Sequence, residues 1–78
     1  MSEITIREAR DEDAGAIARL AALDEGQVPC GAALLAFVDG ELAVARSLRY
    51  GDTVADPFRR TAEVIDLLDL RAHQAGAR

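Results

Sequence analysis

The sequence predicts an α+β domain with a four-stranded antiparallel sheet, in the order β-α-β-β-β-α and with one helix on each face. Three observations predict it. Residues 33–38 and 42–48 are apolar runs. They flank Asp39-Gly40, which is typical of a two-residue hairpin turn because both turn positions adopt positive φ. Residues 11–24 and a segment near the C-terminus carry apolar residues at helical spacing.

The first strand and helix are expected in the N-terminal third. Apolar and polar residues alternate over residues 4–7, which predicts a short strand with one buried face. The acids at 11–13 precede an alanine-rich stretch, where they suit a helix start because they meet free N–H groups and the positive end of the helix dipole. We expect the helix to run from about Asp11 to Asp24 and to stop at Gly26, followed by a loop over residues 26–31.

The hairpin turn also predicts which residues pair. The expected pairs are Phe37 with Leu42 and Leu35 with Val44 on one face, and Ala36 with Ala43 and Leu34 with Ala45 on the other. Both faces would then be apolar, which predicts a sheet that is covered on both sides. The face with Ala36, Ala43 and Ala45 would be nearly flat and would let a helix approach closely.

The remaining elements follow a second turn, expected at residues 50–52. A third hairpin strand is predicted at 53–55. The last helix is expected to begin near Pro57, with Thr61 as an alternative N-cap, and to continue to about Gln74. One face of this helix carries the apolar residues Val64, Ile65, Leu68 and Ala72.

Length and composition predict a single domain over residues 1–78. Half of the 78 residues are apolar, which favours a packed core over disorder. Much of that share is alanine, which buries little area, and stabilisation scales with buried area at roughly 25 cal/mol per Å². We therefore expect marginal stability or help from a second chain.

Charge and cysteine content restrict the partners and the compartment. The formal charge is −5, and this argues against nucleic acid or an anionic membrane as a partner, since both need a basic surface. Cys30 is the single cysteine, so an intrachain disulfide is excluded and a reducing compartment is favoured. Residues 2–10 lack the apolar core of a signal peptide, and no apolar run approaches the ~18 residues of a membrane span. A cytoplasmic location is the expectation.

Few residues suggest chemistry, and we expect no catalytic and no metal site. His73 is the only histidine and lies near a helix end, where a surface role is favoured. Cys30 has no Lys or Arg nearby in sequence to activate its thiol. Ser47 and Tyr50 have no base beside them and are interpreted as ordinary surface residues.

The segment from Asp56 to Ala62 is the most informative candidate site. It joins a strand to a helix and places Arg59 and Arg60 at the helix start, where free N–H groups and arginine can bind an anion. The alternative is a plain strand-to-helix turn. The segment contains no glycine, and the backbone therefore cannot approach a phosphate as closely. This favours the plain turn.

The order and spacing of these segments resemble a known family. Residues 4–14 look like the opening strand and first helix of the GNAT acetyltransferase fold, and residues 34–48 look like its Asp-Gly hairpin. Residues 54–57 look like its fourth strand with a Val-Asp-Pro turn, and Leu67-Leu68 falls where its coenzyme-binding helix has a leucine pair. The resemblance covers the N-terminal half of that fold.

The resemblance implies acetyl-CoA as a cofactor, and it would place the cofactor on Val54, Arg59, Arg60, Thr61 and Ala62. The family binds the pyrophosphate with Arg/Gln-x-x-Gly-x-Gly/Ala, and this sequence departs from the motif. An alignment on Arg60 puts Glu63 and Ile65 at the glycine positions, and an alignment on Arg59 puts Ala62 and Val64 there. Neither supplies the glycines, and Glu63 would repel a pyrophosphate. The family's fifth strand would follow Arg78.

Two hypotheses result. The first is a shortened, degenerate GNAT-like domain that is non-catalytic, binds no cofactor and acts through a homodimer or a protein partner. The second is an acetyltransferase or acyl-CoA binder completed by a second chain. Leu70 points away from the apolar stripe of its helix and is flanked by Leu67, which indicates either an association surface or an isolated exposed hydrophobic residue. We also expect an exposed sheet edge at residues 53–55, which would invite pairing.

Overall fold

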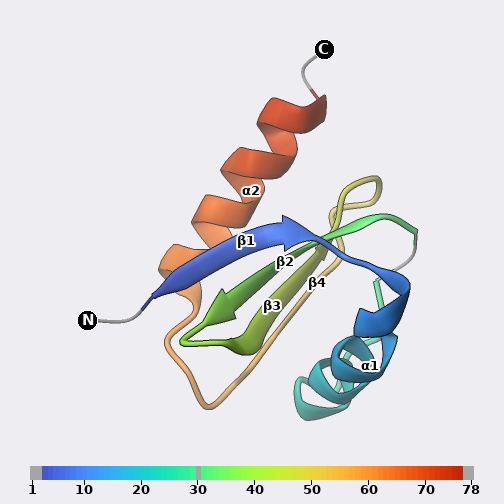
Figure 1. Cartoon of the computed structure of the whole chain (residues 1–78), viewed down its shortest axis with the longest axis vertical. Helices are drawn as coiled ribbons and strands as arrows, with labels where there is room; N and C mark the ends of the chain where they lie inside the picture. Colours follow the sequence, from blue (N-terminus) through green and yellow to red (C-terminus); the bar gives the residue numbers. More distant parts are fainter. Residues whose placement is uncertain (1–2, 30, 77–78) are drawn as a thin grey trace.

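The computed structural model describes residues 3–29 and 31–76 of the chain. The elements are β1 (Ile4–Glu8), a 3-10 turn η1 (Asp11–Asp13), α1 (Ala14–Leu23), β2 (Ala33–Val38), β3 (Glu41–Ser47), β4 (Thr53–Ala55) and α2 (Ala62–Gly76). The strands form one sheet in the order β1-β2-β3-β4, and every neighbouring pair is antiparallel. Figure 1 shows this sheet with the two helices well apart from each other. The predicted α+β class and four-stranded antiparallel sheet are confirmed.

Helix α1 ends at a different left-handed residue from the one predicted. Glu25, rather than Gly26, takes the left-handed conformation, with φ of 52°. The N–H of Gly26 donates to the carbonyl of Ala21 at 2.9 Å, and that of Glu25 donates to Ala22 at 3.2 Å, which is the Schellman pattern. Gly26 has a different role. A Cβ at this position would lie 2.9 Å from Cγ1 of Val54, and glycine therefore allows the helix end to approach β4.

The β2–β3 hairpin has the predicted turn. Asp39 and Gly40 have φ of 53° and 83°, as a two-residue turn of this kind requires. The pairing of Phe37 with Leu42 is also confirmed. The N–H of Asp39 donates to the carbonyl of Glu3 at 2.8 Å, and its Oδ1 accepts the N–H of Glu3 at 2.8 Å. The turn is thereby attached to the residue that precedes β1.

Beyond that first pair the predicted register is wrong. The register shifts between Ala36 and Phe37, and Ala43 is the extra residue of a β-bulge on β3. The observed pairs are Ala36 with Val44, Leu35 with Ala45 and Leu34 with Arg46, in place of Ala36 with Ala43, Leu35 with Val44 and Leu34 with Ala45. Because both faces of both strands are apolar, the hydrophobic pattern carries no signal that could reveal such a shift.

Two separate clusters of buried residues form the core. One joins α2 to the sheet and contains Leu34, Ala36, Ala43, Val44, Val64, Leu68 and Ala72. The other joins α1 to the sheet and contains Ile17, Leu20, Ala21, Leu35, Ala45 and Val54. Ala45 therefore packs against α1, and the expected flat face of Ala36, Ala43 and Ala45 does not form. The bulge is the reason, because it shifts every β3 residue after Ala43 to the opposite side.

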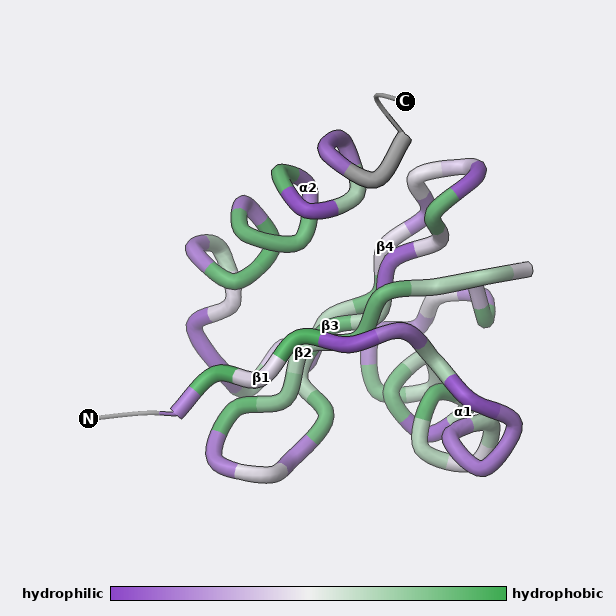
Figure 2. The backbone as a smooth tube through the Cα atoms, turned by 45° about the horizontal axis from the view of Figure 1, so that its top comes forward, coloured by the Kyte–Doolittle hydropathy of each residue, from purple (hydrophilic) through white to green (hydrophobic). Residues whose placement is uncertain are grey.

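The last helix begins later than Pro57. The carbonyl of Thr61 accepts the N–H of Ile65 at 2.8 Å, which is the first helical bond. This favours the alternative start at Thr61. Val64, Leu68 and Ala72 are buried and Ile65 is half-buried, as the apolar stripe predicts. Figure 2 shows hydrophobic and hydrophilic stretches alternating along this helix. Within the described residues, neither helix is long and apolar enough to cross a membrane.

Candidate functional site

The connection between β4 and α2 is organised by Asp56. Its Oδ1 accepts the N–H of Phe58 at 2.9 Å, and its backbone carbonyl accepts the N–H of Arg59 at 3.3 Å. An aspartate that bonds the backbone two residues further on forms an Asx turn. The other carboxylate oxygen of Asp56, Oδ2, lies 3.4 Å from Nε of Arg59. Asp56 therefore closes this turn with its own side chain.

Arg59, one of the two predicted anion-binding arginines, is held by carboxylates from two segments. Besides Asp56, it contacts Oε2 of Glu41 at the start of β3, at 2.8 Å. Its side chain is 31% exposed, and the side chain of Asp56 is 17% exposed. An incoming anion would have to compete with two resident negative charges for this guanidinium.

The other residues of the candidate cofactor site lie in two different places, a hollow at the start of α2 and the core. Arg60, Thr61 and Ala62 line a hollow of about 560 Å³ at the start of α2. The remaining wall is formed by Ile4, Val38, Glu63 and Val64. Val54 does not line it, because its side chain is 4% exposed and lies in the α1 cluster. Three of the five predicted residues are thus brought together, while Arg59 is paired and Val54 belongs to the core.

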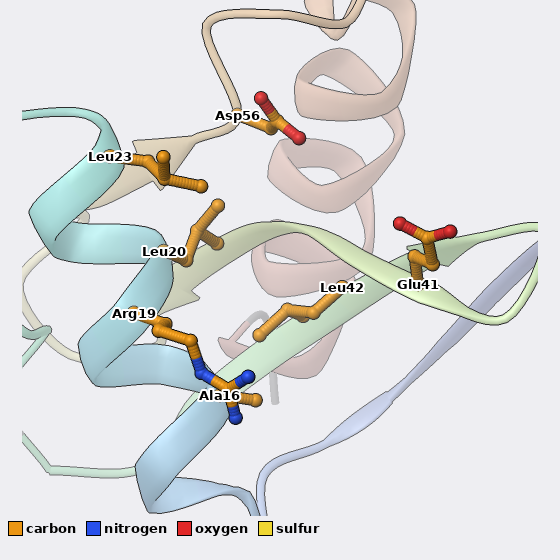
Figure 3. A pocket seen from close by; sticks show the side chains of 7 residues that line it. All are labelled: Ala16, Arg19, Leu20, Leu23, Glu41, Leu42 and Asp56. Carbon is orange, nitrogen blue, oxygen red and sulfur yellow. The ribbon is translucent and has the colours of Figure 1, made fainter.

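A second hollow, of about 280 Å³, lies between α1 and the sheet (Figure 3). Helix α1 contributes Ala16, Arg19, Leu20 and Leu23; β3 contributes Glu41 and Leu42; and Asp56 comes from the turn after β4. The hollow shares Glu41 and Asp56 with the ion pairs of Arg59. Sequence reasoning missed it, because its residues come from three segments and carry no motif.

The residues considered for chemistry have ordinary structural roles where the structure describes them. Ser47 is fully buried, not a surface residue as expected, and its Oγ accepts the N–H of Tyr50 at 3.1 Å. Tyr50 is 63% exposed, with the guanidinium of Arg49 5.9 Å from its ring centroid. His73 is exposed. Cys30 lies outside the described residues, and among those residues no cluster of potential metal ligands occurs.

One carboxyl group has a strongly shifted pKa. Oδ2 and Oδ1 of Asp13 accept hydrogen bonds from Nη1 and Nη2 of Arg7, both at 2.8 Å, and Oδ2 also accepts the N–H of Arg10 at 2.7 Å. The Arg7 guanidinium, followed by the Arg10 N–H, lowers the pKa of Asp13 to about 2. The pair raises the pKa of Arg7 in turn. Asp13 connects β1 to the start of α1, so the shift reflects a structural ion pair.

The outward side of α2 presents a small apolar surface. Leu67 is 42% exposed and Leu70 is 54% exposed. Together with Glu63 and Asp66 they line a hollow of about 390 Å³ on the helix surface.

The edge at β4 is less open than the sequence suggested. Oδ2 of Asp24, just after α1, accepts the N–H of Ala55 at 3.1 Å. A carboxylate on an edge N–H hinders the addition of another strand.

A scan against known protein families and searches of curated proteins and solved structures found no match to this chain.

Proposed function

We propose that this chain is a GNAT-like half domain without catalytic activity that acts by associating with another protein chain, in the first place with itself. The observation that carries the proposal is the pairing of Arg59 with both Glu41 and Asp56, at 2.8 and 3.4 Å. In an acyl-CoA site, the corresponding turn would have to receive a pyrophosphate. Here carboxylates already occupy the guanidinium, and no glycine brings the backbone close to a ligand.

The arrangement of elements supports the GNAT-like part of the proposal. Leu34 and Ala36 of β2 pack with α2, whereas Leu35 packs with α1. Successive residues of a strand point to opposite faces, and this favours one helix on each face. The order β-α-β-β-β-α and the Asp-Gly hairpin also agree with the N-terminal half of that fold.

The exposed leucines of α2 support association. Leu67 and Leu70 are adjacent on the helix surface, and both are about half exposed. A chain of 78 residues with an alanine-rich core gains stability from burying such a surface against a second chain. We place this association in the cytoplasm, on the basis of the single cysteine, and assign it no nucleic-acid partner, because of the net charge of −5.

Two measurements on the full chain test the proposal. Sedimentation equilibrium from 10 to 500 µM is expected to show a reversible monomer–dimer equilibrium, and calorimetric titration with acetyl-CoA is expected to show no binding at millimolar ligand. A monomer mass at every concentration would refute self-association. Micromolar binding of acetyl-CoA would refute the cofactor-free reading.

The second candidate function is acyl-CoA binding or acetyl transfer completed by another chain. The observation that favours it is the hollow of about 560 Å³ next to the first turn of α2, which Arg60 and Thr61 line. Under this reading, Arg60→Ala would abolish binding of acetyl-CoA, while Arg71→Ala, at the far end of the same helix, would leave it unchanged.

A further inference from the structure

The hollow on the outward side of α2 has the spacing of a knobs-into-holes site. Its lining residues, Glu63, Asp66, Leu67 and Leu70, occupy positions i, i+3, i+4 and i+7 of one helix. Four residues at this spacing form the hole that receives one side chain of a facing helix in a coiled coil. The volume of about 390 Å³ lies over the surface of the helix and is open to a second chain.

Leucine is a suitable side chain to enter this hole, and the same surface presents two. Leu67 and Leu70 are about 60° apart around an α-helix, so they project together. Val64, Leu68 and Ala72, in contrast, are buried against the sheet. The outward leucines are therefore not needed by the core of their own domain.

Charge is distributed asymmetrically along this surface, which we call the α2 outer face and define by Glu63, Asp66, Leu67, Leu70, Arg71 and His73. Glu63 and Asp66 precede the leucines, and Arg71 and His73 follow them. Asp69 lies beside this surface and is paired with Arg46 of β3 at 2.6 Å. An antiparallel second helix places the acidic end of one copy opposite the basic end of the other. A parallel helix would place like charges together and align the two helix dipoles unfavourably.

From these features we propose that two copies of this chain associate through antiparallel packing of their α2 outer faces, with Leu70 of each copy entering the hole of the other. The proposal rests on the proposed self-association and adds its surface and its orientation. The pattern of acids, leucines and bases is self-complementary about a point between Leu67 and Leu70. Such a surface is what a two-fold symmetric interface requires, and this favours a second copy over an unrelated partner.

The first test removes the Leu70 side chain, which enters the hole of the partner copy. Leu70→Ala is expected to weaken the dimer at least tenfold in sedimentation equilibrium. Leu23→Ala is the matched control, since Leu23 is a leucine at a helix surface with 50% exposure on α1. The control is expected to retain the wild-type dissociation constant. A Leu70→Ala dimer as tight as that of the wild type would overturn the proposal.

The second test exchanges charges. The double variants Glu63→Lys/Asp66→Lys and Arg71→Glu/His73→Glu each carry one sign of charge on the outer face. Each alone is expected to be monomeric at concentrations where the wild type is dimeric, and an equimolar mixture is expected to form heterodimers. Circular dichroism of each variant verifies that it is folded. If each variant alone forms a dimer as tight as that of the wild type, the proposal is overturned.

The third test distinguishes antiparallel from parallel packing by cross-linking, in a Cys30→Ser background. Antiparallel packing centred between Leu67 and Leu70 brings position 63 of one copy near position 74 of the other. A mixture of Glu63→Cys and Gln74→Cys chains is therefore expected to form the mixed disulfide rapidly, and Glu63→Cys alone to dimerise slowly. The reverse result overturns the antiparallel arrangement.

The tests separate two kinds of failure. If the wild type is monomeric up to 500 µM, the proposed function fails and this surface has no role in self-association. If the wild type is dimeric but unaffected by the Leu70 and charge variants, self-association stands and the assignment of the surface fails.

Discussion

Arg7 on β1 donates two parallel hydrogen bonds of 2.8 Å to the carboxylate of Asp13 at the start of α1. The residues are six positions apart and belong to different elements, so the pair ties the first strand to the first helix. The guanidinium of Arg7 also lies 4.8 Å from the ring centroid of Phe37 on the neighbouring strand. Arg7 thereby joins β1, η1 and β2.

The pH dependence of stability follows from this pair. The pKa of Asp13 is about 2 in the folded chain, below the ordinary value of 3.8. A carboxyl with a lowered folded pKa stabilises the fold above its ordinary pKa, and that stabilisation is lost as the pH falls from about 4 toward 2. Urea unfolding between pH 2 and 6 is expected to show this loss in the wild type and a flatter profile in Asp13→Asn.

The control for this prediction is Glu12→Gln, which alters a neighbouring acid in an exposed pair, 3.5 Å from Arg10. It is expected to keep the wild-type pH profile, because an exposed pair contributes little. Identical profiles for Asp13→Asn and the wild type would show that the Arg7 pair does not stabilise the fold.

Gly26→Ala is expected to destabilise the domain by about 1–3 kcal/mol, since the new Cβ would lie 2.9 Å from Cγ1 of Val54 in a packed core. Gly15→Ala is the matched control. A Cβ there meets nothing within 4 Å, and the helical position favours alanine by about 0.5–1 kcal/mol. Chemical denaturation of both variants measures the difference.

A double-mutant cycle tests the cause. Val54→Ala removes the methyl group that the new Cβ would meet, so the combined variant is expected to be more stable than the sum of the two single changes predicts. Strict additivity would mean that Gly26→Ala acts by another route.

Leu68→Ala is expected to cost about 2–5 kcal/mol, because Leu68 is fully buried in the α2 cluster. Its neighbour Leu67 is 42% exposed, and Leu67→Ala is expected to change stability by at most about 0.5 kcal/mol. Thermal unfolding at 5 µM, where association is weak, compares the two. Equal effects would mean that α2 is rotated on the sheet relative to the structure.

Asp24→Ala removes the acceptor of the Ala55 N–H at the β4 edge. The amide hydrogen of Ala55 is then expected to exchange with solvent up to about tenfold faster, because one typical hydrogen bond contributes about that factor. Hydrogen exchange by NMR measures this. Asp24→Asn retains a carbonyl acceptor and is the matched control. Unchanged exchange in Asp24→Ala would mean that the carboxylate does not protect the edge.

Sequence reasoning succeeded where the signal is local. The turn at Asp39-Gly40 requires positive φ at two adjacent residues, and few other residue pairs provide it. The stripe on α2 repeats with the helical period and needs no knowledge of the sheet. The residues of β2 and β4 were predicted to the residue, because turn-forming residues bound both strands.

The errors concern contacts between distant segments. The bulge at Ala43 leaves no trace in a strand that is apolar on both faces. Ser47 is predicted to lie on the surface, yet it is fully buried, and its Oγ accepts the N–H of Tyr50 from the turn that follows β3. In the candidate site, the arginine pair was recognised. The carboxylate of Glu41 that binds Arg59 comes from 18 residues away, and no periodic pattern links the two.

The bulge at Ala43 also affects how α2 packs against the sheet. Without it, β3 would present only the small side chains of Ala43 and Ala45 to the helix, and the contact between β3 and α2 would fix the helix less well. The bulge turns the fully buried Val44 toward α2 and sends Ala45 to the other side. Val44 thereby adds a branched side chain to the surface beneath α2, next to Leu34 of β2. A larger side chain at this point restricts the rotation of the helix on the sheet, and with it the direction in which Leu67 and Leu70 point.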